Sequence, residues 1–148
     1  MAKTVTPAIS TEQKIKEAAA RIFTQKGFAA TKTREIAEEA GINLALLNYY
    51  FRSKDRLYQI VMQENMQAFK QGLAELFGDQ TLDVHQKIEK LANYYIDEFT
   101  AHKELPAFII STINSSDFSD LFREDEKDLI RSRGVFLKQL TELLAKRK

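Results

Sequence analysis

The side chains between residues 33 and 54 have the chemistry needed to contact a nucleic acid. Amide, hydroxyl and cationic groups alternate there with small apolar side chains. An asparagine can pair bidentately with the N6/N7 edge of adenine, whereas cationic and hydroxyl groups donate to phosphate oxygens, and leucine or alanine can contact a thymine methyl. The expected DNA-contacting residues are Thr33, Arg34, Asn43, Leu44, Ala45, Asn48, Tyr49, Tyr50 and Lys54.

The expected roles differ with the chemistry of each group. Asn48 is expected to read a base edge, since its amide both donates and accepts. Lys54 is expected to meet a phosphate beside the free N–H groups at the start of a helix. Thr33 and Arg34, at the start of the first helix of the predicted pair, would also contact phosphates. The tyrosines would present their hydroxyls to the DNA backbone.

Each of these residues also has a purely structural interpretation. Arg34 can be a solvated charge, and either Tyr49 or Tyr50 can be a packing residue. Asn43 can serve as a helix cap and nothing more. Three neighbouring side chains are expected in the core of this region, without any contact to DNA: Leu46, Leu47 and Phe51.

Two short helices joined by a tight turn are predicted to position these groups. Thr33 is expected to cap a helix that ends at Gly41, and Asn43 to cap a second helix over residues 44–50. Two short helices with a glycine-containing turn are typical of a helix-turn-helix, whose second helix enters the major groove. We expect Gly41 to adopt the left-handed conformation that ends the first of these helices.

A further helix is predicted to precede this pair and support it. Ser10 and Gln13 have the spacing of a capping box, and Gly27 is expected to stop the helix. The apolar residues between them recur with the helical period. The predicted buried face consists of Ile15, Ala18, Ala19, Ile22 and Phe23.

The rest of the chain is predicted to be helical as well, with no strand and no repeat. Ser53 is expected to cap a fourth helix that ends at Gly78, Pro106 to lie in the first turn of a sixth, and 115–120 to form a loop. The expected apolar face of the fourth helix is Leu57, Ile60, Val61, Phe69, Leu73, Leu76 and Phe77. That of the fifth is Val84, Ile88, Leu91, Ala92, Tyr95 and Phe99, and the seventh is marked by Leu129, Arg133, Phe136, Leu137, Leu140 and Leu144.

Composition excludes several classes of protein. The 148 residues include no cysteine, which removes disulfides and thiolate sites, and no segment approaches a membrane span. We therefore expect a cytoplasmic protein with no membrane partner. Residues 1–60 hold ten Lys/Arg against six Asp/Glu, so the basic excess lies in the part suited to a polyanion.

Catalysis and metal binding have little support in the sequence. His85 and His102 lie seventeen residues apart, with no carboxylate at metal-ligand spacing. The acidic residues between 117 and 126 suggest a cation site, but EF-hand spacing is absent and a hydrated loop is the preferred interpretation. We expect no catalytic residue, metal or cofactor.

The segment from Thr33 to Leu57 resembles the DNA-binding head of the TetR family of transcriptional regulators. The matching residues are Thr33, Ile36-Ala37, Ala40-Gly41, Asn43, Leu47, Tyr49-Tyr50, Phe51, Ser53-Lys54 and Leu57, with Ala18, Phe23 and Gly27-Phe28 before them. The resemblance covers about a third of the chain. It departs from the family pattern at Leu44, Ala45 and Asn48, which puts the operator sequence in question rather than the mode of binding.

The resemblance implies an all-α protein with a flexible arm over 1–9, a three-helix head over 10–58 and a helical regulatory domain over 59–148. It implies a repressor released from operator DNA by a small-molecule effector, acting as a homodimer. Two further helices would complete the domain, so we expect an incomplete chain that exposes part of the apolar stripe on the seventh helix. Residues suggested for the effector are Phe69, Tyr94, Phe108 and Phe118, and Tyr94 is of interest because it lies off the predicted stripe.

Two other classes of protein remain open at this point. A helical small-molecule carrier would no longer need the cationic and hydroxyl groups of the head. A protein–protein adaptor predicts a continuous exposed apolar stripe rather than a capped helix-turn-helix. Binding to non-specific duplex that weakens steeply with salt would distinguish the regulator from both.

Overall fold

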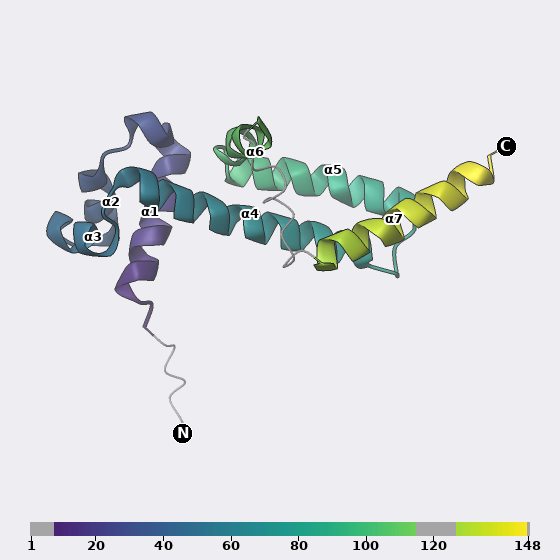
Figure 1. Cartoon of the computed structure of the whole chain (residues 1–148), viewed down its shortest axis with the longest axis horizontal. Helices are drawn as coiled ribbons and strands as arrows, with labels where there is room; N and C mark the ends of the chain where they lie inside the picture. Colours follow the sequence, from purple (N-terminus) through teal and green to yellow (C-terminus); the bar gives the residue numbers. More distant parts are fainter. Residues whose placement is uncertain (1–7, 115–126, 148) are drawn as a thin grey trace, which may run out of the picture. The chain divides into compact units, whose positions relative to one another are not determined.

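The computed structural model describes residues 8–114 and 127–147, and every regular element in these ranges is a helix (Figure 1). The predicted all-α fold is therefore confirmed. None of the described helices is long and apolar enough to cross a membrane. The elements are α1 (Thr11–Ala30), α2 (Thr33–Ala40), α3 (Leu44–Tyr50), α4 (Lys54–Gly78), α5 (Val84–Ala101), α6 (Leu105–Asn114) and α7 (Lys127–Ala145).

Side-chain caps begin three of the helices where the sequence predicted them. The hydroxyl of Ser10 accepts from the Gln13 N–H at 3.1 Å, and the Asn43 amide oxygen accepts from the Leu46 N–H at 2.8 Å. At α4 the hydroxyl of Ser53 accepts a backbone N–H at 3.1 Å. Each cap satisfies an N–H that has no partner within its own helix. The predicted bounds of α3, residues 44–50, are those observed.

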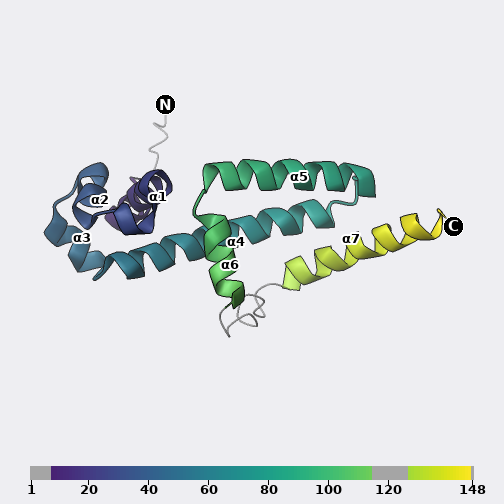
Figure 2. The same ribbon diagram turned by 90° about the horizontal axis from the view of Figure 1, so that it is seen from above.

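The chain divides into two compact units, Met1–Met62 and Gln63–Lys148, with the boundary inside α4. In the second unit α5 runs antiparallel beside α4, and α6 starts near the end of α5 and lies across α4 (Figure 2). The core there consists of Met66, Phe69, Leu73 and Leu105, packed against half-buried residues of α4, α5 and α6. The loop predicted over residues 115–120 lies outside the described residues.

The predicted apolar face of α5 is partly wrong, because polar contacts determine which side of the helix faces inward. Ile88 and Tyr95 were expected inside but are 48% and 37% exposed. Lys87 is fully buried instead, and its ammonium donates to the Phe77 carbonyl and to the Gln139 side chain, both at 2.7 Å. Removal from water lowers the pKa of Lys87. A buried ammonium must find acceptors, and these lie at the end of α4 and on α7.

Tyr94 packs against the core of the second unit. This corrects the expectation that it lies off the buried stripe. Its hydroxyl donates to the Phe69 carbonyl at 3.0 Å, and its ring stacks on that of Phe69 at 5.5 Å. Burial raises the pKa of Tyr94 to about 12. Tyr94 can reach this carbonyl of α4 because residue 72 has no side chain, so the phenol lies where a Cβ would be.

The helix α7 contacts the rest of its unit through an aromatic pair as well as through Gln139. The rings of Phe77 and Phe136 lie 5.0 Å apart. Leu137 and Leu144 are 51% and 58% exposed, so part of the apolar stripe predicted on this helix faces solvent, as expected.

We predict that Gly72→Ala destabilises the second unit. The new methyl would overlap the Tyr94 phenol, which is fixed by stacking and by its hydrogen bond, and overpacking of this kind costs about 1–3 kcal/mol. The matched control is Gly134→Ala on α7, where a Cβ meets nothing within 4 Å. It should be neutral or stabilising by up to about 1 kcal/mol, because alanine is the better helix former. Urea unfolding measures both; equal effects would contradict the close fit at residue 72.

Candidate nucleic-acid interface

The first unit is held together by a small apolar core under α2 and α3. All five residues predicted to form the inner face of α1 are buried. From the other elements this core receives Ile36, Ala37, Leu47, Phe51, Leu57, Val61 and Met62, each at most 3% exposed. The core therefore joins both helices of the predicted helix-turn-helix to α1 and to the start of α4.

The turn between α2 and α3 is built on Gly41, which has the predicted left-handed conformation at φ 70° and ψ 31°. Its N–H donates to the Glu38 carbonyl at 3.1 Å, and the Ile42 N–H donates to the Ala37 carbonyl at 3.0 Å. These bonds satisfy the last carbonyls of α2. Asn43 caps α3 two residues later, so the second helix starts directly after the first has ended.

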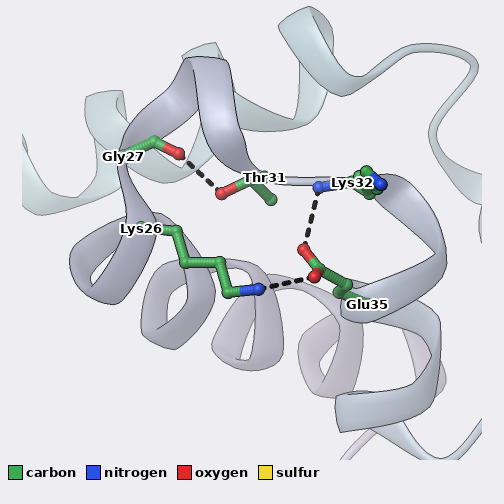
Figure 3. Close-up of polar contacts among 5 residues, drawn as sticks. All are labelled: Lys26, Gly27, Thr31, Lys32 and Glu35. Atoms are coloured by element: carbon green, nitrogen blue, oxygen red, sulfur yellow. Dashed lines mark hydrogen bonds and ion pairs between the residues drawn. The ribbon is translucent and has the colours of Figure 1, made fainter.

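The connection from α1 to α2 is a compact set of polar contacts (Figure 3). The chain leaves regular helix at Gly27, with φ 76° and ψ 168°, and the buried Thr31 hydroxyl donates to the Gly27 carbonyl at 2.6 Å. Glu35 accepts from the Lys26 ammonium at 2.5 Å and from the Lys32 N–H at 3.1 Å. The hydrogen bond from Lys26, followed by that from Lys32, lowers the pKa of Glu35.

These contacts correct the expectation that Thr33 caps α2. Lys32 occupies the cap position in an extended conformation, and Thr33 is the first helical residue. The acceptor at the start of α2 is a side-chain oxygen of Glu35, in the first turn of the helix. It accepts a hydrogen bond from the Lys32 N–H. A second ion pair, between Arg21 and Glu39 at 2.9 Å, also joins α1 to α2.

The outer face of α3 carries four of the nine side chains expected to contact DNA. Asn48 and Ala45 are exposed, Tyr49 is 79% exposed and Tyr50 is 39% exposed. The two tyrosine rings meet edge to face with their centroids 5.4 Å apart. On the opposite face Leu47 is completely buried.

Leu46 was expected in the core together with Leu47 and Phe51, and this is wrong. Leu46 is 36% exposed, whereas Leu47 and Phe51 are 0% and 3% exposed. Consecutive residues of a helix point about 100° apart. The rotation that buries Leu47 therefore turns Leu46 outward.

Four other predicted contacts lie outside this outer face. Leu44 is half-buried at the start of α3, and Asn43, which caps the helix, is exposed. On α2, Arg34 is exposed and Thr33 is half-buried.

Lys54 has partners within the head that the sequence did not indicate. Its ammonium donates to the Phe28 carbonyl at 2.8 Å and lies 4.3 Å from the centroid of the Phe28 ring. The two residues are 26 positions apart, so no local pattern could have paired them.

Three of the four aromatic residues suggested for an effector lie in one cluster. Phe69 is 4% exposed in the core of the second unit, and Tyr94 and Phe108 pack against that core. Phe118 lies outside the described residues.

Comparison with known proteins connects this head to one family. Residues 15–61 match the family model "Bacterial regulatory proteins, tetR family". YttP of Bacillus subtilis, described as an HTH-type transcriptional regulator, is 30% identical over 117 residues, covering 78% of this chain and 56% of YttP. The HTH-type transcriptional repressor NicS of Pseudomonas putida is 30% identical over 104 residues, covering 70% of this chain and 48% of NicS. The chain thus spans about half the length of these curated relatives.

A solved structure has the same fold. The protein, from Mesorhizobium loti and assigned to the tetR family, aligns with a TM-score of 0.63 at 19% identity, covering 89% of this chain and 68% of that chain.

We predict that Gly41→Val destabilises the head by about 1–2 kcal/mol and weakens duplex binding, whereas Gly41→Asn has a smaller effect. No atom lies within 4 Å of a Cβ at this position, so the cost is that of the left-handed backbone, which asparagine tolerates best after glycine. Urea unfolding followed by circular dichroism gives the free energies. Gly134→Val on α7 is the control for adding the same side chain. Equal stability of the Gly41→Val and Gly41→Asn variants would show that the turn is built differently.

Proposed function

The head of this chain belongs to the tetR family of bacterial regulatory proteins, and on this premise we propose that the chain is a DNA-binding transcriptional regulator that reads a duplex with α3. The observation that carries the proposal is the division of α3 into two faces. Leu47 is buried on one face, while Asn48 and Tyr49 are exposed on the other. A helix held in this way can enter the major groove without losing its own support.

We assign the contacts by chemistry. Asn48 pairs with a base edge, and Leu44 and Ala45 contact a thymine methyl beside it. Tyr49 and Tyr50 donate their hydroxyls to phosphate oxygens. A further set of groups holds the register on the DNA backbone without reading sequence: Thr33, Arg34 and Lys54. Asn43 remains primarily the cap of α3, and its contact with DNA is secondary.

We also propose that the regulator represses transcription as a homodimer. NicS is named a repressor, which supports that direction of control. One recognition helix of seven residues spans few base pairs, and two heads in successive major grooves, about 34–36 Å apart, would supply the missing contacts.

Release by a small molecule is the proposed means of control. Phe69, Tyr94 and Phe108 are our suggested effector residues. Phe69 is buried beneath Tyr94, so an effector would have to displace the tyrosine ring to reach it. Binding there would therefore disturb the contact between α4 and α5. We assign the chain no reaction, since its proposed role is binding.

Non-specific duplex binding tests the proposal against the carrier and the adaptor. A labelled random duplex of about 30 base pairs is titrated with the chain between about 50 and 200 mM salt. The logarithm of the affinity should fall linearly with the logarithm of salt concentration, with a slope near −0.9 per phosphate contacted. Absence of binding at the lowest salt, with helix content intact, would contradict the proposed function and favour the other two classes.

Asn48→Ala tests which residue carries sequence information. On a preferred site selected from random duplexes, the variant should lose about 1–3 kcal/mol of binding free energy, because a bidentate pair to one base is removed. Its affinity for random duplex should stay close to that of the unchanged chain. Asn93→Ala on the exposed side of α5 serves as the matched control and should alter neither value. An equal loss on every duplex would remove Asn48 from base reading.

A further inference from the structure

The contact between Lys54 and Phe28 has two parts that act on the same ammonium. Lys54 is the first residue of α4, and its ammonium donates one hydrogen bond to the Phe28 carbonyl. The same nitrogen lies over the face of the Phe28 ring. A cation over an aromatic face is attracted by the negative π cloud of the ring. The lysine head group is therefore held by one residue from two directions.

Phe28 is itself fixed in place. Its ring lies 6.2 Å from that of Phe23 and 4.8 Å from that of Tyr58. Its carbonyl also accepts the Thr31 N–H at 3.3 Å, and the buried Thr31 hydroxyl holds the Gly27 carbonyl next to it. The last turn of α1, after the kink at Gly27, thus presents a carbonyl and a ring, both held by neighbouring contacts, to the start of α4.

Neither part of this contact neutralises the lysine. An ammonium has three donors, and the carbonyl uses one of them. The carbonyl and the ring carry no formal charge, so the cation keeps its full attraction for an anion. A free lysine side chain loses conformational entropy when it is fixed, and here part of that loss has already occurred in the folded head.

We propose that Phe28 is a positioning residue for DNA binding: it orders the Lys54 ammonium for a backbone phosphate while touching no DNA itself. The inference rests on the proposed function, within which it assigns Phe28 a role in binding. It requires that removal of the ring weakens DNA binding only while Lys54 is present.

A double-mutant cycle on random duplex tests this requirement. The variants are Phe28→Leu, Lys54→Met and the two combined, with Phe28→Tyr as the conservative replacement that keeps a ring. Lys54→Met should make the salt slope shallower by about 0.9, the value for one phosphate. Phe28→Leu should weaken binding about two- to fivefold, because a lysine that the ring no longer holds must lose its conformational freedom when it binds, and Phe28→Tyr should restore most of the affinity.

In the Lys54→Met background, Phe28→Leu should change the affinity by less than about 1.5-fold, since no cation remains to be positioned. Equal losses in both backgrounds would give Phe28 a packing role only and overturn the proposal. Ile22→Val, a mild loss from the same core, controls for general destabilisation and should leave the salt slope unchanged. Failure of the unchanged chain to bind would refute the proposed function itself, which is a different result from binding without coupling.

A second measurement decides the question if Phe28→Leu does not fold. The ε-methylene protons of Lys54 should be shifted upfield by the ring current of Phe28 in the free chain. They should remain shifted when random duplex is bound, because the ring holds the lysine in both states. Loss of the upfield shift on binding would mean that Lys54 leaves Phe28 to reach the phosphate, which would overturn the positioning role.

Discussion

A helix of seven residues is not stable by itself in water, because nucleating a helix costs more than so few hydrogen bonds return. The helix α3 therefore depends on its surroundings. Asn43 satisfies one of its free N–H groups, that of Leu46; Leu47 buries its inner face, and Phe51 is buried directly after its end. The outward direction of Asn48 and Tyr49 follows from these three constraints. Residues that need not touch a ligand thus determine which side chains the head exposes to solvent.

The second unit is organised by a different requirement, the satisfaction of polar groups inside an apolar environment. Lys87 and Tyr94 both lie on the side of α5 that faces α4, and each donates to a main-chain carbonyl of that helix. Leaving this ammonium buried and unpaired would cost several times more free energy than burial of Ile88 would gain. The helix therefore turns Ile88 toward solvent and keeps its lysine inside.

Whether a contact could be predicted from the sequence depends on how far apart in the chain its two residues lie. Caps at Ser10, Asn43 and Ser53, the bounds of α3 and the inner face of α1 were predictable, because each depends on residues within one or two turns. The face of α5 was mispredicted because a count of apolar residues cannot know that Lys87 will find Gln139, 52 positions away. Thr33 is not the cap for a similar reason: Lys32 occupies that position, and its N–H donates to the carboxylate of Glu35, which Lys26 on α1 also contacts. The resemblance predicted Lys54 as a DNA contact, but no spacing rule joins it to Phe28.

The fit of the Tyr94 phenol against residue 72 also has an evolutionary consequence. While the tyrosine is present, any side chain at position 72 overlaps it; once the tyrosine is replaced by a smaller residue, the space becomes available. The two positions are consequently epistatic, and the order of substitutions matters. A lineage that first shrinks residue 94 can later fill residue 72, whereas the opposite order passes through an overpacked intermediate. The hydrogen bond to the Phe69 carbonyl thus restricts how this chain can diverge as well as how it folds.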